Sequence, residues 1–199
     1  MPGLRILGID PGSSATGFGV VERTGGHLVH VEHGTLRLAR GAALADRLAA
    51  LYAALAAVVE RTRPDAAVVE RVFVSASPAS ALVLGQARGV ALAALASAGL
   101  PVHELAPAQV KQAVTGAGSA DKRQVQAMVQ RLLGLARPPA RDAADALAAA
   151  LCQAQAGPLL ALARPGAAAP RGRRSLRAVA EAWALRAGPP GTLRRSPLR

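Results

Sequence analysis

Four acidic side chains carry the chemistry that this sequence suggests. Asp10 and Glu70 each end a short apolar run that is typical of a buried strand. In open α/β sheets, ligands bind at the carboxyl ends of the strands. Asp142 and Asp145 are three residues apart in an alanine-rich segment, so they share one face of a predicted helix. The four carboxylates are therefore candidates for one site at the end of a sheet.

A bound cation explains these carboxylates best. Two like charges three residues apart slightly destabilise a bare helix, and a cation would neutralise both. Oxygen ligands without a His or Cys cluster favour Mg²⁺, or Mn²⁺, over Zn²⁺. Two such ions ~4 Å apart would activate water and stabilise the leaving oxygen in an in-line phosphodiester displacement. The predicted chemistry is phosphodiester hydrolysis with two metal ions per active site.

Each acidic residue alone also has a simpler structural explanation. Asp10 could be a turn residue before a proline, and Asp142 could cap a helix after a pair of prolines. Glu70 could pair with Arg71 or face solvent. Glu70 fits the simpler explanation least well, because a carboxylate that follows Ala-Ala-Val-Val is costly to bury without a partner.

The hydrophobic pattern predicts an α/β fold. Three strands in hairpin order are followed by alternating helices and strands and then by helices only, which suits a sheet with an antiparallel edge. The expected strands are 5–10, 16–22, 27–36, 66–70 and 102–105, and the expected helices are 42–62, 79–98, 107–114, 121–135 and 141–155.

Charge and composition divide the chain in two. The 199 residues are enough for one well-buried domain, which we assign to residues 1–156. The formal net charge of +12 indicates a polyanionic partner, with DNA or RNA favoured over a membrane. Residues 164–199 carry nine arginines and one glutamate, whereas eleven of the twelve acidic residues precede them. Residues 157–199 are therefore predicted to form a flexible, Pro/Ala/Arg-rich basic tail.

The chain is predicted to work in the cytoplasm and without a membrane. Cys152 is the only cysteine, so no intrachain disulfide can form, which fits a reducing compartment. The N-terminus lacks the apolar stretch of a signal peptide. No apolar run was expected to approach the length that spans a bilayer.

Five motifs of this sequence occur together in one nuclease family. The similarity covers residues 4 to 155 in the family's order and spacing. The motifs are Gly8-Ile9-Asp10-Pro11-Gly12 followed by Thr16-Gly17-Phe18-Gly19, Val69-Glu70-Arg71-Val72-Phe73, Ser80-Ala81-Leu82 with Leu84-Gly85-Gln86-Ala87-Arg88-Gly89, Val110–Val114 with Gly116–Lys122, and Asp142–Ala148. The first motif is shared with other ribonuclease-H-like proteins, but the five together specifically resemble the RuvC family of Holliday-junction resolvases.

The resemblance implies a function and an assembly. It implies a ribonuclease-H-like fold, with a mixed five-stranded sheet and flanking helices. The expected form is a homodimer that nicks two opposing strands of a four-way DNA junction in homologous recombination and DNA repair. The RuvA–RuvB branch-migration complex is the implied partner.

The resemblance also implies roles for single residues. Asp10, Glu70, Asp142 and Asp145 match the metal ligands. Lys111 and Lys122 match lysines near the scissile phosphate, and a compact ammonium suits a point charge there. Phe73 matches an aromatic that stacks on a base where the junction opens, and its alternative is a core position. The further candidate DNA contacts are Arg71, Arg88 and Arg123. Ser77 stands where many members carry Asn, which puts an amide contact in doubt.

Two other function classes remain open at this point. Asp10-Pro11-Gly12 followed by Thr16-Gly17 also resembles the phosphate loop of the actin and sugar-kinase superfamily. That class needs a second domain, for which this chain is too short. A noncatalytic nucleic-acid-binding protein would bind without a metal and form no product, and the four placed carboxylates argue against it.

Overall fold

The computed structural model describes residues 3–39, 41–71 and 78–161, which belong to one compact unit. Phe73, Ser77 and residues 162–199 lie outside the described residues, and so do the side chains from residue 157 onward. The predicted basic tail, and with it the proposed division of the chain, therefore stays a prediction.

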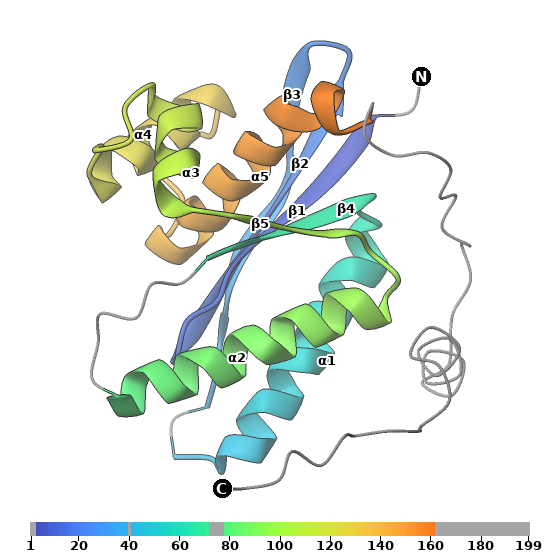
Figure 1. Cartoon of the computed structure of the whole chain (residues 1–199), viewed down its shortest axis with the longest axis vertical. Helices are drawn as coiled ribbons and strands as arrows, with labels where there is room; N and C mark the ends of the chain where they lie inside the picture. The colour runs from blue at the N-terminus through green and yellow to red at the C-terminus, as the bar shows by residue number, and fades with distance from the viewer. Residues whose placement is uncertain (1–2, 40, 72–77, 162–199) are drawn as a thin grey trace, which may run out of the picture. The chain divides into compact units, whose positions relative to one another are not determined.

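A mixed five-stranded sheet forms the centre of this unit (Figure 1). The strands are β1 (Leu4–Asp10), β2 (Ala15–Thr24), β3 (His27–Arg37), β4 (Ala66–Glu70) and β5 (Val102–Leu105). Their order is β3-β2-β1-β4-β5. The first three strands pair antiparallel, whereas β1, β4 and β5 pair parallel. The sheet confirms the predicted fold class.

Five helices cover the two faces of the sheet (Figure 1). They are α1 (Leu44–Thr62), α2 (Pro78–Ser97), α3 (Pro107–Thr115), α4 (Lys122–Leu132) and α5 (Arg141–Ala161). Successive side chains of a strand point to opposite faces. Ile6 and Val68 accordingly pack in the core on the α3–α4–α5 side, and Leu7 and Val69 pack in the core on the α1–α2 side. Both faces of the parallel strands are therefore buried, as their continuous apolar runs require.

Two glycines let α5 lie unusually close to the sheet. A Cβ atom added at Gly8 of β1 would collide with the carbonyl oxygen of Ala146, and one at Gly17 of β2 would collide with that of Asp142. Both obstacles are helix backbone, which cannot rotate away as a side chain can. The glycines thus fix the height of the N-terminal half of α5 above the ends of β1 and β2.

The C-terminal end of α5 differs from the prediction. The helix was expected to end at residue 155, but it continues to Ala161 through Gly157 and Pro158. A proline inside a helix has no N–H to donate to the carbonyl four residues earlier. That carbonyl belongs to Ala154, and it accepts a hydrogen bond from Nη1 of Arg23 at 3.2 Å. A side chain of β2 thus supplies the donor that Pro158 lacks.

Helix α2 corrects the expectation about membrane-length segments. Its 20 residues, with a mean hydropathy of 1.5, are long and apolar enough to cross a bilayer by length and composition alone. Alanine, leucine and valine dominate the helix, and small side chains allow close packing of Ala87, Ala91, Ala94 and Leu95 in the core. Only 22% of its apolar stretch is buried in the described structure, and one such helix is by itself weak evidence for a membrane segment.

Candidate active site

The two strand carboxylates lie side by side. In the parallel pairing of β1 with β4, Ile9 stands opposite Val69, so the next residues, Asp10 and Glu70, end adjacent strands. Neighbouring strands are about 4.8 Å apart. By the alternation of side chains, both carboxylates point to the face that α5 covers, as Ile6 does. This placement agrees with the sequence-based expectation.

Helix α5 brings the other two carboxylates to the same place. Asp142 lies in the first turn of α5, and Asp145 follows almost one turn later; both are half-buried. The close packing of Asp142 on Gly17 holds this end of the helix against β2.

The charges of these groups act on one another. Burial raises the pKa of Asp10 from its usual 3.8 to about 7. The negative charges of Glu70, Asp145 and Asp142 add to this increase, and the positive charge of Lys122 opposes it. Burial likewise raises the pKa of Glu70, and the charge of Asp145 raises it further. The four carboxylates therefore share one electrostatic environment in which two of them resist ionisation.

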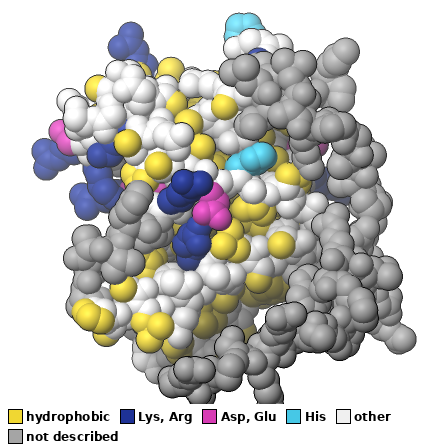
Figure 2. Space-filling model, in the orientation of Figure 1, with side chains coloured by type: hydrophobic (Ala, Val, Ile, Leu, Met, Phe, Trp, Pro, Cys, Tyr) yellow, Lys and Arg dark blue, Asp and Glu magenta, His cyan; other side chains and the backbone are white. Residues whose placement is uncertain are grey.

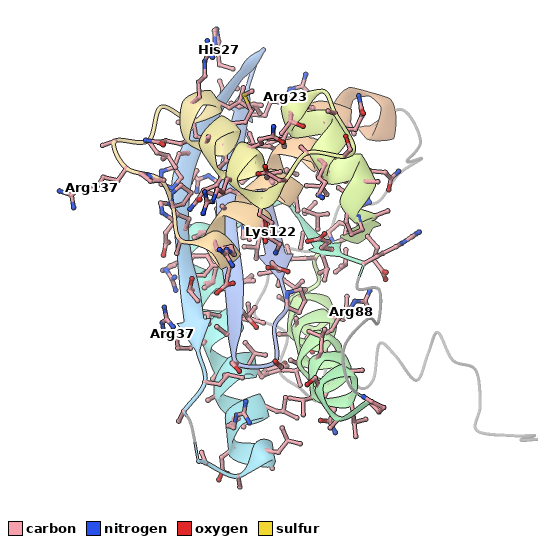
Figure 3. The ribbon with its side chains drawn as sticks, turned by 90° about the vertical axis from the view of Figure 1, so that its left-hand side faces the viewer. Arg23, His27, Arg37, Arg88, Lys122 and Arg137 are labelled. Carbon is pink, nitrogen blue, oxygen red and sulfur yellow. The ribbon has the colours of Figure 1, made fainter. Side chains whose placement is uncertain are left out.

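Two lysines partly balance the negative charge. Lys122 is the first residue of α4, and its Nζ donates to Oδ2 of Asp145 at 2.9 Å. Its side chain is 63% exposed, whereas that of Asp145 is 16% exposed. The bond to Asp145 raises the pKa of Lys122. Lys111, on α3, is near enough to lower the pKa of Glu70. Figure 3 shows Lys122 at the start of α4, on the side of the molecule turned to the viewer.

The carboxylate oxygens of this corner suit a hard cation, although the described side chains are not grouped closely enough to hold one. Among residues 3–39, 41–71 and 78–161, no three His, Cys, Asp or Glu side chains form a group that could hold a metal ion as they stand. The four oxygen donors nevertheless share a partly buried corner, where a cation would relieve the repulsion that raises the pKa of Asp10. The assignment of these four carboxylates as metal ligands therefore stays a prediction, which their placement and their charges support.

The predicted arginines lie around the same end of the sheet. Arg71 and Arg88 both pair with Glu104 of β5, at 3.9 and 2.6 Å. Glu70 therefore does not use Arg71 as its counterion, which was the simpler explanation of that carboxylate. Arg123 is exposed in the first turn of α4, where its backbone N–H donates to the capping carboxylate of Asp121 at 2.8 Å. Whether these arginines contact DNA stays a prediction.

Two polar residues next to this site were not predicted from the sequence. Glu104 is the common partner of Arg71 and Arg88. Arg47 of α1 donates from Nη2 to the carbonyl oxygen of Ser13 at 2.8 Å and so braces the loop that follows Asp10. The position of Glu104 near the end of a strand was a usable signal. Nothing in the sequence around Arg47 distinguishes it from other helical arginines.

A family profile decides the relationship that the motifs suggested. The profile described as "Crossover junction endodeoxyribonuclease RuvC" matches residues 6–153. This chain belongs to the RuvC family. The match spans all four candidate carboxylates, and it leaves the kinase-like explanation of the first motif without support.

Curated RuvC-family relatives are similar over most of the chain. A crossover junction endodeoxyribonuclease from Alkalilimnicola ehrlichii is 57% identical over 148 residues, which cover 74% of this chain and 89% of the relative. One from Chloroflexus aurantiacus is 53% identical over 158 residues, covering 79% of this chain and 96% of the relative.

Solved structures agree with this relationship. The RuvC of Thermus thermophilus in complex with a Holliday junction substrate has a TM-score of 0.74 and 35% identity, and the match covers 78% of this chain and 96% of that one. The yeast mitochondrial Holliday junction resolvase Ydc2, at 15% identity and a TM-score of 0.58, shares the fold.

Proposed function

We propose that this chain resolves four-way DNA junctions by metal-dependent hydrolysis, with Asp10, Glu70, Asp142 and Asp145 as the metal ligands. Family membership supports the enzyme class directly: the chain is a crossover junction endodeoxyribonuclease, and nucleases of this family depend on a metal ion. The observation that carries the residue assignment is the mutual electrostatic influence of carboxylates from β1, β4 and α5.

The proposed cofactor is a pair of Mg²⁺ ions, for which Mn²⁺ could substitute. Bound there, the ions would supply Lewis-acid stabilisation of the developing charge and a deprotonated water at neutral pH. The chain's own contribution is to hold the ligands in place: β1 and β4 present Asp10 and Glu70 from a rigid sheet, and α5 presents Asp142 and Asp145.

The cationic side chains are proposed to position the DNA backbone. Lys111 and Lys122 lie close enough to Glu70 to lower its pKa, so a phosphate that they bind would be next to the carboxylates. Arg71 and Arg123 are proposed to extend this path away from the site, whereas Arg88 is proposed to act on it only through its bond to Glu104. The role of Phe73, base stacking at the opened junction, rests on the motif alone.

A second copy of the chain is proposed to complete the enzyme. A four-way junction presents two opposing strands, and one set of carboxylates can cut one strand at a time. The face of α2 opposite Ala87 and Ala91 carries Leu82, whose exposed fraction is 65%. Only 22% of the apolar stretch of α2 is buried in the described structure. An exposed apolar helix of this kind favours a protein–protein contact, so we assign α2 to the homodimer interface.

The cellular setting is proposed from the family resemblance alone. It comprises the cytoplasm and cooperation with the RuvA–RuvB branch-migration complex.

The central test compares substrates and metals with purified protein. A synthetic four-way junction, the matching linear duplex and a single-stranded RNA are incubated with Mg²⁺, Mn²⁺ or a chelator. We expect paired nicks in the junction only, and only with a metal. Asp10→Asn and Glu70→Gln should retain junction binding and lose cleavage, while Asp46→Asn, on the exposed face of α1, should cut normally. Robust cutting by Asp10→Asn or Glu70→Gln refutes the ligand assignment.

A further inference from the structure

An arginine–glutamate–arginine cluster lies at the edge of the sheet, next to the carboxylate site. Glu104 of β5 stands opposite Val69 of β4 in the parallel register, and Val69 faces the α1–α2 side. Glu104 and its two arginine partners are therefore on the opposite face of the sheet from Glu70. In Figure 2, acidic and basic side chains meet near the middle of the face over β5.

The two arginines hold the same carboxylate oxygen in different ways. Nη2 of Arg88 is 2.6 Å from Oε2 of Glu104, and Nε of Arg71 is 3.9 Å from that same atom. The Arg88 side chain is 23% exposed, and the Arg71 side chain is 59% exposed. The first contact is a short charge-assisted hydrogen bond. The second is an exposed, long ion pair of a kind that contributes little to stability.

The backbone beside the cluster fixes the point from which the Arg71 side chain starts. The N–H of Arg71 donates to the carbonyl oxygen of Leu105 at 2.8 Å, so the pairing of β4 with β5 continues one residue past Glu70. The Arg71 side chain therefore starts from a fixed point directly beside a proposed metal ligand. Figure 3 shows Arg88 on α2, the helix that carries the second arginine of the cluster.

From this geometry we propose that the cluster is a DNA-phosphate subsite in which Arg71 exchanges Glu104 for a backbone phosphate while Arg88 stays on Glu104. This inference rests on the proposed function. Two guanidinium groups share one carboxylate, so the cluster carries a net positive charge that attracts an anion. Arg71 loses little when it leaves Glu104, and its planar fork suits bidentate binding of phosphate. Glu104 acts as a positioning residue that also competes with phosphate and so weakens binding to unbranched DNA.

The experiment measures binding of full-length protein to a labelled junction and to linear duplex across a salt titration, with Ca²⁺ in place of Mg²⁺ to prevent cutting. Each phosphate contact contributes about 0.9 to the slope of log K against log salt on duplex DNA. Arg71→Gln should lower the slope magnitude by about this amount, whereas Arg71→Lys should restore it. Glu104→Gln should lower the dissociation constant for linear duplex several-fold. The ratio of junction affinity to duplex affinity should therefore decrease.

Two arginine variants serve as comparisons. Arg88→Gln should lower the unfolding temperature and leave the slope within error, because Arg88 stays on Glu104. Arg63→Gln removes an exposed charge just before the opposite end of β4 and should change neither quantity. An unchanged slope in Arg71→Gln, or a slope loss in Arg88→Gln instead, overturns the exchange. If the wild-type protein neither binds nor nicks the junction, the proposed function fails as well. If only the exchange is wrong, the wild-type protein still binds and nicks the junction.

Discussion

Asp10→Asn should stabilise the metal-free protein although it is expected to abolish cleavage. In the folded chain, burial and the nearby carboxylates raise the pKa of Asp10 from 3.8 to about 7. Above pH 7 the folded state must therefore hold a charge that the unfolded chain carries in water at no cost. Each pKa unit corresponds to 1.36 kcal/mol, so about three units make about 4 kcal/mol at pH 8. Asparagine removes this charge and keeps the shape.

The sign of the pH dependence follows from proton binding. Between pH 4 and pH 7 the folded state binds more protons at Asp10 than the unfolded state, so wild-type stability falls as the pH rises. The advantage of Asp10→Asn should accordingly grow by about 2 to 3 kcal/mol between pH 5 and pH 8 and level off above that. Because the buried amide also loses its hydration, we expect a net gain of about 1 to 4 kcal/mol at pH 8.

Urea denaturation in the presence of a chelator, followed by far-ultraviolet circular dichroism at several pH values, measures this difference. Asp46→Asn is the matched control: this exposed side chain in the first turn of α1 should change stability by less than about 0.5 kcal/mol at any pH. With Mg²⁺ present, wild type should gain stability and the variant should not. A difference between Asp10→Asn and wild type that is the same at pH 5 and pH 8 would refute the assigned environment of Asp10.

Three further predictions test the parts that position the site. Gly8→Ala should cost about 3 kcal/mol or more in urea denaturation and reduce cleavage, because its Cβ meets the backbone of α5. Gly26→Ala, with open space around it in the turn between β2 and β3, should change stability by less than about 1 kcal/mol. Leu82→Glu should shift the protein from dimer to monomer in analytical ultracentrifugation, whereas Leu132→Glu, at an exposed position of α4, should leave the dimer intact. A Leu82→Glu variant that is still dimeric would exclude α2 as the interface. Lys122→Met should lower the single-turnover cleavage rate at least tenfold with folding preserved by circular dichroism, because Asp145 loses its counterion and the DNA loses an ammonium; an unchanged rate would remove Lys122 from the reaction.

Local sequence patterns were sufficient for the elements that carry the strand carboxylates. The strand 66–70 was predicted with the bounds that the structure has, and the strand predicted as 5–10 begins only one residue earlier, because short apolar runs between turn residues permit few alternatives. Once both strands were placed, the carboxyl-end rule located Asp10 and Glu70 together. The α5 boundary failed because Pro158 normally ends a helix, and the hydrogen bond from Arg23 that satisfies the affected carbonyl comes from a distant strand.

Long-range contacts account for what the sequence did not show. Glu104 was overlooked since its partners, Arg71 and Arg88, come from other segments of the chain. The exposed face of α2 was overlooked for a related reason: a run of small and aliphatic residues looks the same in a core helix as in one that covers a partner. Only the burial of Ala87 and its neighbours in the structure shows which face of α2 packs against the core of the same chain.

The arrangement of charge also explains why the site needs both lysines and glycines. Gly8 and Gly17 bring α5 so close to β1 and β2 that its two aspartates cannot avoid the field of Asp10 and Glu70. Without a metal, this proximity destabilises the fold, and the ammonium of Lys122 on Asp145 offsets part of the repulsion. If Asp145 holds a cation as proposed, Lys122 would have to give up its bond to this carboxylate, and its ammonium would then be free beside the carboxylates to contact a DNA phosphate. The same lysine can then stabilise the free protein first and contact the substrate afterwards.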